Sequence, residues 1–390
     1  MNVCFETFGC RLNRAEALED EAKCLAVGHK VVTDHKEADF FVIRGCSVTS
    51  RAQRDCEKLI AHLREKYPMK RIHVTGCLAN ARPFVIKQRD DRPPVPMRTA
   101  RAYLKAQDGC TGECTFCIVP RFRGKSAAEG FTGVVDKAKR FIEAGYHEIV
   151  LTGCNLSLYA SEGKRLPDLV ATLAELDPAC RIRLGSLEPF LTADETIDAM
   201  AEHANVCRFL HMPVQSGSNG ILRRMQRPYS VEDAVQLMQK ARRLMPFACL
   251  GCDMIAGFPG ESERDHSASL ALLTELKIAN VHAFPFSRRP GTPAATMAGQ
   301  LPHERVVGRA RSLAKIGHRN RQVFAGQFVG RTVEAVIEHD DTAAGWTGEY
   351  LWLEESEAER EKHAPGNLRR QTVGFRVLKA DGGRLYGVRL

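Results

Sequence analysis

The stretch Asp108-Gly-Cys-Thr-Gly-Glu-Cys-Thr-Phe-Cys117 places Cys110, Cys114 and Cys117 in a C-x3-C-x2-C spacing inside a short polar loop. A structural zinc site uses four protein ligands. A [4Fe–4S] cluster held by three cysteines instead keeps one iron free for a further ligand. Three closely spaced cysteines therefore indicate an open-iron cluster site, and the rest of the chain tests that interpretation.

Composition and charge limit the classes of protein that this chain can be. With 44% hydrophobic and 26% charged residues among 390, the chain is not wholly disordered and is long enough for two or three domains. It contains no apolar run of about 18 residues and no signal-peptide pattern, so we expect a cytoplasmic protein without a membrane span. Fourteen cysteines then favour metal or redox chemistry, and a formal charge of +9 suits a polyanionic partner.

Residues 1–95 repeat one pattern, in which an apolar, β-rich run is followed by Gly-Cys. The three cysteines that follow these runs are Cys10, Cys46 and Cys77. Helical patterns between the runs predict a parallel α/β sheet, whose carboxyl strand ends would bring the three thiols together. A second three-cysteine site is thus expected here. Burial of these cysteines as small packing residues is the alternative.

Capping signals mark where the helices of this domain begin, and a cluster of prolines marks where the domain ends. Asn13 followed by Glu16 resembles a capping box for the first helix, and Thr49 or Ser50 would cap the second. Residues 81–100 hold four prolines without clear periodicity, which indicates a linker. We therefore place the first domain at residues 1–95.

Residues 96–320 alternate β and α patterns, which predicts a partial (βα)6 barrel with its chemistry on the loops at the carboxyl strand ends. The cysteine loop follows the first predicted strand, and Glu188 and Gln215 follow the third and fourth. Cys249 and Cys252 form a C-x-x-C motif within a strand pattern. Residues three apart in a strand point to opposite faces, so we expect packing there. The predicted strands are 102–106, 148–152, 181–184, 206–210, 248–255 and 280–286.

Residues 321–390 contain short β-like runs, which predict a small all-β barrel. This domain carries no net positive charge, which weakens the case that it binds nucleic acid alone, and a purely structural β-cap is the alternative. The helix-like run Arg305–Arg321 before it is strongly basic.

The open-iron loop, with Phe116 directly before its last cysteine, resembles the radical S-adenosylmethionine superfamily. Further motifs resemble the methylthiotransferases, which combine an N-terminal three-cysteine domain, a radical S-adenosylmethionine barrel and a C-terminal TRAM domain. The segments around Cys10 and Cys46 are most similar to the MtaB branch, which acts on N6-threonylcarbamoyladenosine 37 of tRNA. The motifs are Thr7-Phe-Gly-Cys-Arg-Leu-Asn13, Gly45-Cys-Ser-Val-Thr49, Thr75-Gly-Cys77, Arg183–Pro189, His211–Gly217, Gly257–Gly260 and Arg289–Pro293.

Three other functions stay open beside this one. Sister methylthiotransferases act on N6-isopentenyladenosine 37 of tRNA or on an aspartate of a ribosomal protein, and the same six cysteines would serve them. A non-catalytic iron–sulfur or zinc RNA-binding protein is a more distant alternative. The chain also departs from the family pattern: the segment between Cys77 and Cys110 is short, which predicts a truncated N-terminal sheet. Arg44 stands where asparagine is more frequent.

The resemblance implies two [4Fe–4S] clusters, each on one cysteine triplet. The cluster on Cys110, Cys114 and Cys117 would cleave S-adenosylmethionine to a radical that removes hydrogen from C2 of the modified adenine, and the cluster on Cys10, Cys46 and Cys77 would supply the sulfur. Phe116, Glu188 and Gln215 are the expected cofactor contacts. The expected partners are a tRNA anticodon stem-loop and an electron donor of the flavodoxin or ferredoxin type. Basic residues for the RNA phosphates are Arg121, Arg123, Lys125 and the run Arg305–Arg321.

Overall fold

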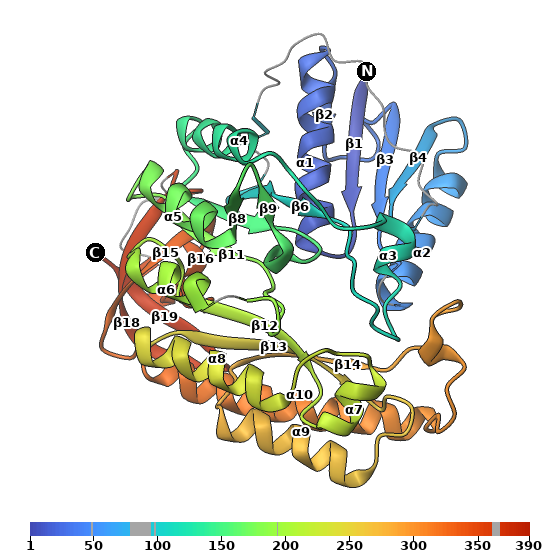
Figure 1. Cartoon of the computed structure of the whole chain (residues 1–390). Coiled ribbons are helices and arrows are strands. Elements are labelled where there is room, and N and C mark those ends of the chain that lie inside the picture. The colour runs from blue at the N-terminus through green and yellow to red at the C-terminus, as the bar shows by residue number, and fades with distance from the viewer. Residues whose placement is uncertain (48–49, 79–94, 97–98, 193, 361–366) are drawn as a thin grey trace.

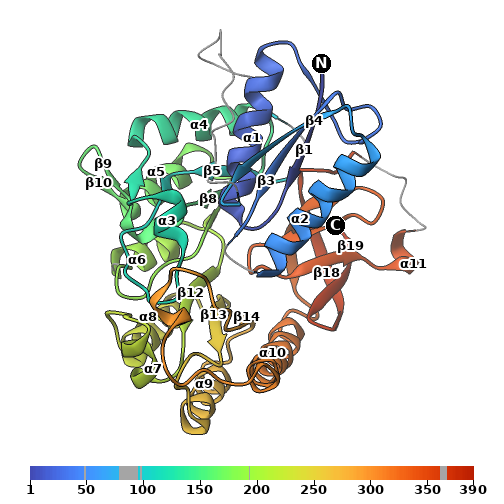
Figure 2. The same cartoon turned by 90° about the vertical axis from the view of Figure 1, so that its right-hand side faces the viewer.

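The computed structural model describes residues 1–47, 50–78, 95–96, 99–192, 194–360 and 367–390. These residues form an N-terminal α/β layer, a larger α/β half and a C-terminal closed β-barrel (Figure 1; Figure 2). No helix among the described residues is long and apolar enough to cross a membrane. The predicted linker, residues 81–100, lies mostly outside the described residues, so the boundary at residue 95 stays a prediction.

The N-terminal layer is a parallel sheet in the order β2-β1-β3-β4. The three predicted strands are present, and β2 is an additional short strand at the edge of the sheet. Burial of Phe41, Ile43 and Leu63 packs α2 against this sheet. The elements are β1 (Asn2–Thr7), α1 (Arg11–Ala26), β2 (Lys30–Val32), β3 (Phe40–Gly45), α2 (Ser50–Lys66) and β4 (Arg71–Gly76).

The expected capping box at Asn13 is wrong. Helix α1 already begins at Arg11, after Cys10, and Asn13 is fully buried inside it. The Asn13 amide Nδ2 donates to the carbonyl oxygens of Phe8 and Gly45 at 2.7 and 3.2 Å. Asn13 therefore ties the helix to the ends of β1 and β3, next to Cys10 and Cys46. Of the two caps expected for α2, Thr49 lies outside the described residues and Ser50 is the first residue of the helix.

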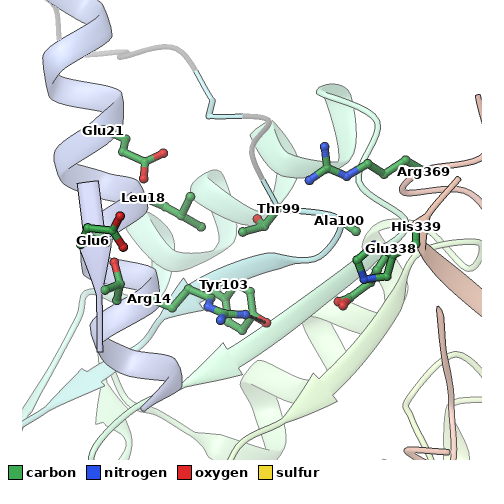
Figure 3. Close-up of a pocket in the computed structure, with 12 residues that line it drawn as sticks. Glu6, Arg14, Leu18, Glu21, Thr99, Ala100, Tyr103, Glu338, His339 and Arg369 are labelled. Carbon is green, nitrogen blue, oxygen red and sulfur yellow. Dashed lines mark hydrogen bonds between the residues drawn. The ribbon is translucent and has the colours of Figure 1, made fainter. Parts of the chain in front are cut away.

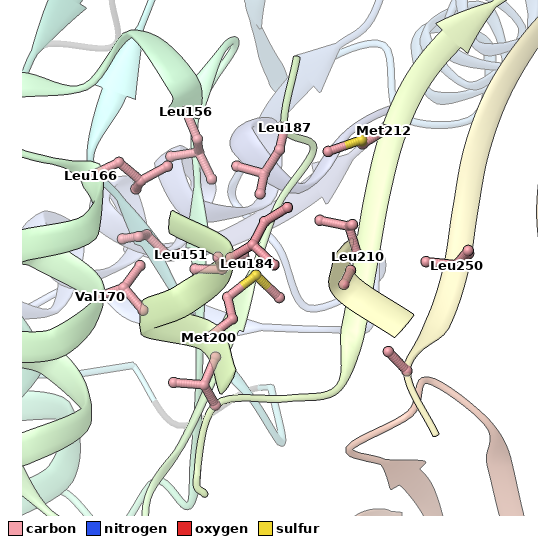
Figure 4. Close-up of a cluster of buried hydrophobic side chains, with 14 of the residues drawn as sticks. Leu151, Leu156, Leu166, Val170, Leu184, Leu187, Met200, Leu210, Met212 and Leu250 are labelled. Carbon is pink, nitrogen blue, oxygen red and sulfur yellow. The ribbon is translucent and has the colours of Figure 1, made fainter. Parts of the chain in front are cut away.

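The larger half holds two three-stranded parallel sheets, β5-β8-β11 and β12-β13-β14, joined by the parallel bridges Ile182–Val206 and Ser186–His211. Five helices, together with Ala310 and Leu313 of α10 (His303–Gly326), cover one face and bury a continuous apolar core against it (Figure 4). The strands are β5 (Ala102–Lys105), β8 (Glu148–Thr152), β11 (Arg181–Leu184), β12 (Phe209–Gln215), β13 (Cys249–Ala256) and β14 (Asn280–Pro285). The five helices are α4 (Phe131–Glu143), α5 (Leu166–Leu176), α6 (Asp194–Glu202), α8 (Val231–Leu244) and α9 (Glu263–Glu275). The predicted partial barrel is confirmed.

The fourth strand lies later than its prediction of 206–210. Strand β12 contains Pro213, which cannot donate to the ladder, and its register shifts between Met212 and Gln215. Because Pro213 interrupts the β pattern, the sequence did not show the full extent of this strand. The remaining short elements are β6 (Gln107–Asp108), α3 (Val119–Arg123), β7 (Ala127–Ala128), η1 (Leu156–Leu158), β9 (Ala160–Ser161), β10 (Lys164–Arg165), α7 (Asn219–Arg224) and η2 (Pro293–Ala295).

The C-terminal strands close into a five-membered barrel in the order β15-β16-β17-β19-β18, which confirms the predicted TRAM-like fold. The β-like runs expected from the sequence were 329–337, 350–353, 371–378 and 384–388, so β16 is additional; its four residues include a glycine and give too short a β pattern. The elements are α10 (His303–Gly326), β15 (Thr332–His339), β16 (Ala344–Thr347), β17 (Trp352–Glu355), α11 (Glu357–Arg360), β18 (Thr372–Asp381) and β19 (Arg384–Arg389).

Buried charges join this barrel to the first half of the larger sheet. Glu148 is fully buried and accepts hydrogen bonds from Arg181 and Arg183, whose charges hold the pKa of Glu148 far below its usual range. The same arginines donate to the carbonyl oxygens of Trp346 and Thr347, at 2.7 and 2.8 Å. The closed barrel is thus fixed at the amino-terminal ends of β8 and β11, away from the cysteine loop.

Helix α1 packs on the face of β5 and β8 that the five helices leave open. Ala15 and Leu18 of α1 form a buried cluster with Tyr103 and Val150. This packing brings the N-terminal layer beside the inner face of the partial barrel and so positions its cysteines relative to the loop.

Candidate active site

The loop site, our name for Cys110, Cys114 and Cys117, follows the short strand β6. The Cys117 amide donates to the Cys114 carbonyl oxygen at 3.0 Å, and the Gly112 amide donates to the Cys110 sulfur at 3.3 Å. Gly109 has a φ of +65°, and a Cβ there would lie 2.1 Å from the Lys125 carbonyl oxygen. Glycine is therefore required at 109 for the loop to fold back on the chain that follows it.

A buried arginine holds one sulfur of the loop site. Arg227 Nη1 donates to Cys114 Sγ at 3.1 Å, and the guanidinium also forms an ion pair with Glu188. Burial raises the pKa of Cys114 while Arg227 lowers it, and burial raises the pKa of Cys117 to about 12. Burial likewise raises the pKa of Glu188, against the effect of Arg227. Glu188 therefore lies at the site as predicted, but its carboxylate is engaged by Arg227.

Phe116 and Gln215 lie on the same side of the partial barrel. Phe116 packs with Ile255 of β13 against an apolar cluster that includes Met225 and Phe258. Gln215 is buried at the end of β12 with a φ of +70°, a left-handed conformation that non-glycine residues seldom adopt. The strand end is thus held in a specific, strained conformation beside the loop site.

The strand-end site, our name for Cys10, Cys46 and Cys77, lies at the carboxyl ends of β1, β3 and β4, as the sequence predicted. These strands are neighbours in one parallel sheet. Gly9, with a φ of +94°, has no room for a Cβ, because that atom would lie 2.5 Å from the Cys46 Cβ. Burial raises the pKa of Cys77, and the guanidinium of Arg123 acts to lower it.

Arg123 links the two sites. Its Nε donates to Cys77 Sγ at 3.2 Å, and its Nη1 donates to Asp108 Oδ1 at 2.9 Å, two residues before Cys110. Nη1 also reaches Glu16 at 3.0 Å, and Nη2 donates to Asn13 Oδ1 at 2.6 Å. The side chain is 8% exposed, so the prediction that Arg123 contacts RNA phosphates is wrong. It is instead a buried connection between the two cysteine sites.

Residues at the end of β8 lie between the sites as well. Cys154 Sγ lies 3.5 Å from Asp108 Oδ1, and Asn155 Nδ2 lies 4.0 Å from Cys110 Sγ. The Asn155 Oδ1 atom is buried and has no hydrogen-bond partner among the residues that the structure describes. A buried, unpaired oxygen beside the loop site is a polar group that a bound cofactor could satisfy.

The spacing of the sulfurs argues against a single metal ion held by all three cysteines of either site. A tetrahedral zinc ion with Zn–S bonds of about 2.3 Å holds its sulfurs about 3.8 Å apart. Among the described residues, the triplets whose ligand atoms all lie within 4.8 Å of one another are Cys4-Glu6-His35 and His211-Asp253-His282. Neither the loop site nor the strand-end site is so compact. Neither triplet is therefore closed enough to hold a single tetrahedral ion through all three of its sulfurs.

A pocket of about 280 Å³ lies elsewhere, where α1, the segment before β5 and the closed barrel meet (Figure 3). Its lining mixes Glu6, Glu21 and Glu338 with Arg14 and His339, and includes no cysteine among the described residues. It is separate from the two cysteine sites.

Cys249 and Cys252 are both buried on opposite sides of β13, as the strand pattern predicted. Cys252 belongs to the core beneath the five helices, whereas Cys249 packs with residues of α10 and the closed barrel. They contribute to packing.

Comparisons with known proteins agree with this geometry. Residues 104–273 match the radical SAM superfamily, and residues 2–93 match the uncharacterized protein family UPF0004. The threonylcarbamoyladenosine tRNA methylthiotransferase MtaB of Bacillus subtilis is 29% identical over 90% of this chain and 89% of its own. The tRNA-2-methylthio-N(6)-dimethylallyladenosine synthase of Erythrobacter litoralis is 30% identical over the same shares.

A solved structure shares the fold. The radical S-adenosylmethionine methyltransferase TsrM from Kitasatospora setae superposes with a TM-score of 0.54 at 14% identity, covering 75% of each chain. The sequence relatives cover 90% of this chain, and the two family matches span both cysteine sites. The chain therefore belongs to the radical SAM tRNA methylthiotransferases, enzymes that use S-adenosylmethionine and two [4Fe–4S] clusters.

Proposed function

We propose that this methylthiotransferase modifies C2 of N6-threonylcarbamoyladenosine at position 37 of tRNA. The observation that carries this choice is a polar network on β12, β13 and β14. Asp253 Oδ1 accepts hydrogen bonds from His211 Nε2 at 3.1 Å and from His282 Nδ1 at 3.0 Å. Asn280 Nδ2 lies 3.4 Å from the other ring nitrogen of His282.

This network lies close to the loop site. The two imidazoles hold the pKa of Asp253 far below its usual range, and the Asp253 charge in turn raises the pKa of Glu188. A threonylcarbamoyl group carries a carboxylate, a hydroxyl and a ureido group, whereas an isopentenyl group is a hydrocarbon. Sites built from hydrogen-bonding groups strongly reject analogues that lack the matching polar atoms. The network therefore favours the threonylcarbamoyl substrate over the isopentenyl one.

In this proposal the loop site and the strand-end site each hold one [4Fe–4S] cluster. When bound, the clusters and S-adenosylmethionine would supply a carbon radical and sulfur. A radical is required because acid–base chemistry cannot remove hydrogen from an unactivated ring C–H at neutral pH. Arg227 and Arg123 each donate a hydrogen bond to one cysteine sulfur and fix its position. Phe116, in its apolar surroundings, excludes water from the cofactor side and offers a ring face to the adenine. Gln215 offers a buried amide for the cofactor's polar groups.

Exposed cations near the loop and along α10 would contact the anticodon stem-loop. Arg121 and Lys125 follow the cysteine loop, and the exposed members of the basic run are Arg305, Arg311, Lys315 and Arg319. Arg309 is not among them, because it is buried in ion pairs with Glu261 and Glu263. A flavodoxin- or ferredoxin-type electron donor and a cytoplasmic location complete the proposal.

The test offers the reconstituted enzyme two anticodon stem-loops, one carrying N6-threonylcarbamoyladenosine and the other N6-isopentenyladenosine. We expect the 2-methylthio product from the first alone, measured by nucleoside mass spectrometry. Conversion of the isopentenyl stem-loop alone would contradict the proposal. His282→Phe should lower kcat/KM for the threonylcarbamoyl substrate by about tenfold or more, since it removes a polar group from the network. His318→Phe, an exposed position on α10, is the matched control.

A further inference from the structure

A compact group of metal-binding side chains lies in the N-terminal sheet and shares no residue with either cysteine site. In the β1 triplet, our name for Cys4, Glu6 and His35, the sulfur, a carboxylate oxygen and a ring nitrogen lie within 4.8 Å of one another. Among the described residues, the other triplet this compact is the histidine–aspartate network of β12, β13 and β14. Sulfur, imidazole nitrogen and carboxylate oxygen are the donors by which proteins bind zinc. The β1 triplet therefore offers the donor set of a zinc site.

Hydrogen bonding distinguishes the β1 triplet from the network on the three later strands. Arg321 Nη1 donates to Asn280 Oδ1 at 3.4 Å, which directs the Asn280 amide nitrogen to His282 Nε2. That ring nitrogen therefore accepts, and Nδ1 carries the proton that His282 donates to Asp253. A nitrogen that carries a proton cannot bind a metal ion. The later network is thus held as a hydrogen-bonding one, and the β1 triplet is the better metal site.

Strand geometry and the chain after β2 bring the three ligands together. Cys4 and Glu6 lie two residues apart on β1, so their side chains point to the same face of the sheet. His35 lies in the segment between β2 and β3, and its Nε2 lies 2.7 Å from Glu6 Oε1. Cys4 Sγ lies 4.0 Å from the carbonyl oxygen of Thr33, in the same segment. This segment therefore returns beside both ligands of the strand.

Contacts outside the triplet fix the position of His35. Lys70 Nζ donates to the carbonyl oxygens of His35 and Lys36 at 3.1 and 2.8 Å. The His35 ring packs edge-on against Phe41, with ring centroids 5.6 Å apart. A side chain held by packing and by hydrogen bonds to its backbone needs little rearrangement to bind an ion. The third ligand is therefore in place before a metal arrives.

Burial of the triplet suits zinc with one water molecule. Cys4 is buried in an apolar cluster, whereas the Glu6 and His35 side chains are 33% and 28% exposed. Zinc bonds of about 2.0–2.3 Å place tetrahedral ligands about 3.3–3.7 Å apart, so side-chain shifts of about 1 Å close the site. Zinc held by three protein ligands takes water at its fourth position. The exposed side of the triplet leaves room for that water.

We propose that Cys4, Glu6 and His35 bind one zinc ion, with water as the fourth ligand. The ion joins β1 to the segment between β2 and β3 and so stabilises the edge of the N-terminal sheet. Binding releases the Cys4 thiol proton to solvent and changes no oxidation state. The inference goes beyond the proposed function, because it does not depend on which nucleoside the enzyme modifies.

The test adds zinc to the reconstituted holoenzyme, in which iron already occupies the cluster cysteines. We expect elemental analysis to find one zinc ion per chain and an unchanged iron content. X-ray absorption at the zinc edge does not detect iron. It should show one sulfur at about 2.3 Å and three nitrogen or oxygen ligands at about 2.0–2.2 Å.

Two pairs of variants assign the ligands. Residues that merely orient metal ligands are worth about 10- to 100-fold in affinity, so loss of a ligand in His35→Gln should weaken zinc binding at least tenfold. Competition with a zinc indicator measures this, and His62→Gln, at an exposed position on α2, should stay within twofold of the natural protein. Cys4→Ala should remove the sulfur from the zinc spectrum. Cys56→Ala, which deletes a sulfur from the same buried cluster, should keep it.

Thermal unfolding gives an independent measurement, because an ion that binds only the folded state raises the Tm. Zinc should raise the Tm of the natural protein and of His62→Gln but not that of His35→Gln. A holoenzyme that binds no zinc, or full zinc affinity in both His35→Gln and Cys4→Ala, overturns the inference. Zinc bound by three sulfurs with a loss of iron overturns it too, because that ion has displaced a cluster. Equal losses in Cys4→Ala and Cys56→Ala would assign the effect to packing and also refute the site.

Discussion

The loop site and the strand-end site hold the same number of cysteines but are built in opposite ways. Cys110, Cys114 and Cys117 lie within one short loop, so their proximity follows from local chain geometry. Cys10, Cys46 and Cys77 meet only because β1, β3 and β4 are parallel neighbours. Yet each site has one buried arginine on one sulfur, Arg227 on Cys114 and Arg123 on Cys77. The comparison shows that both sites use a buried arginine to hold one sulfur, although the chain assembles the two sites in different ways.

The largest expected effect comes from removing one cysteine of either site, because each substitution should abolish the function of one site and leave the other intact. Cys114→Ala should lose the loop-site cluster and with it all cleavage of S-adenosylmethionine. Cys46→Ala should lose the other cluster but still form 5′-deoxyadenosine. Each variant should retain roughly half of the iron of the natural protein, because each site would hold one [4Fe–4S] cluster. Cys252→Ala, a buried packing residue, is the control and should keep all of the iron. Loss of both clusters from one substitution would show that the sites are not independent.

Removing the arginines should destabilise the fold unequally. Arg227→Leu strands the carboxylate of Glu188, whereas Arg123→Leu leaves Glu16 paired with Arg44 and strands Asp108, which is 31% exposed. Leaving a buried charge unpaired costs about 3–5 kcal/mol, so we expect that decrease in unfolding free energy for Arg227→Leu and a smaller one for Arg123→Leu. Denaturant unfolding measures both. Arg121→Leu, exposed on the same helix as Arg123, should change stability by less than about 0.5 kcal/mol. Equal decreases for all three would contradict the expected ranking.

The pH dependence of cluster assembly offers a subtler comparison. Burial raises the pKa of Cys117 to about 12 and that of Cys77 above its usual range, so both thiols are protonated at neutral pH. Iron binding must displace these protons. Loading should therefore improve as pH rises from 7 to 9, by roughly tenfold in affinity per unit for each such thiol. Arg123 lowers the pKa of Cys77, so Arg123→Gln should weaken loading of the strand-end site alone. Loading that does not change with pH would contradict this account.

The smallest effect concerns a surface outside both sites. Arg311→Gln or Lys315→Gln should weaken tRNA binding modestly. Each should also reduce the slope of log affinity against log salt concentration by about one for each phosphate that the protein no longer neutralises. Glu304→Gln on the same helix is the control and should not reduce the slope. Binding of the stem-loop that ignores ionic strength would refute phosphate contacts at α10.

The sequence predicted the fold class, the six parallel strands and the place of all six cysteines in the fold. Regular β and α patterns show where strands end, and the ends of neighbouring parallel strands bring the residues that follow them together. It also predicted the family, the enzyme class and the cofactors, through motifs that extend over most of the chain. Strand β12 was misplaced because Pro213 and the strained Gln215 obscure its pattern. Asn13 was misassigned because a capping signal and a buried tertiary contact use the same residue type.

The arginines around the sites could not be predicted. Arg227 and Arg123 lie far apart in sequence in segments that show no periodicity, and charge alone assigns such residues to the surface. The structure shows both buried, Arg227 beside Glu188 and the sulfur of Cys114, and Arg123 beside Asp108 and the sulfur of Cys77. Their roles depend on long-range contacts that only the assembled fold creates.

The most direct test of the account is a single turnover with a threonylcarbamoyladenosine stem-loop and isotopically labelled hydrosulfide, followed by nucleoside mass spectrometry. The natural protein should yield a 2-methylthio nucleoside that carries the label. Cys46→Ala should form 5′-deoxyadenosine but no methylthio product, since in the proposed function the strand-end site supplies the sulfur. A methylthio product from Cys46→Ala would contradict the central claim that one cysteine site makes the radical and the other donates the sulfur.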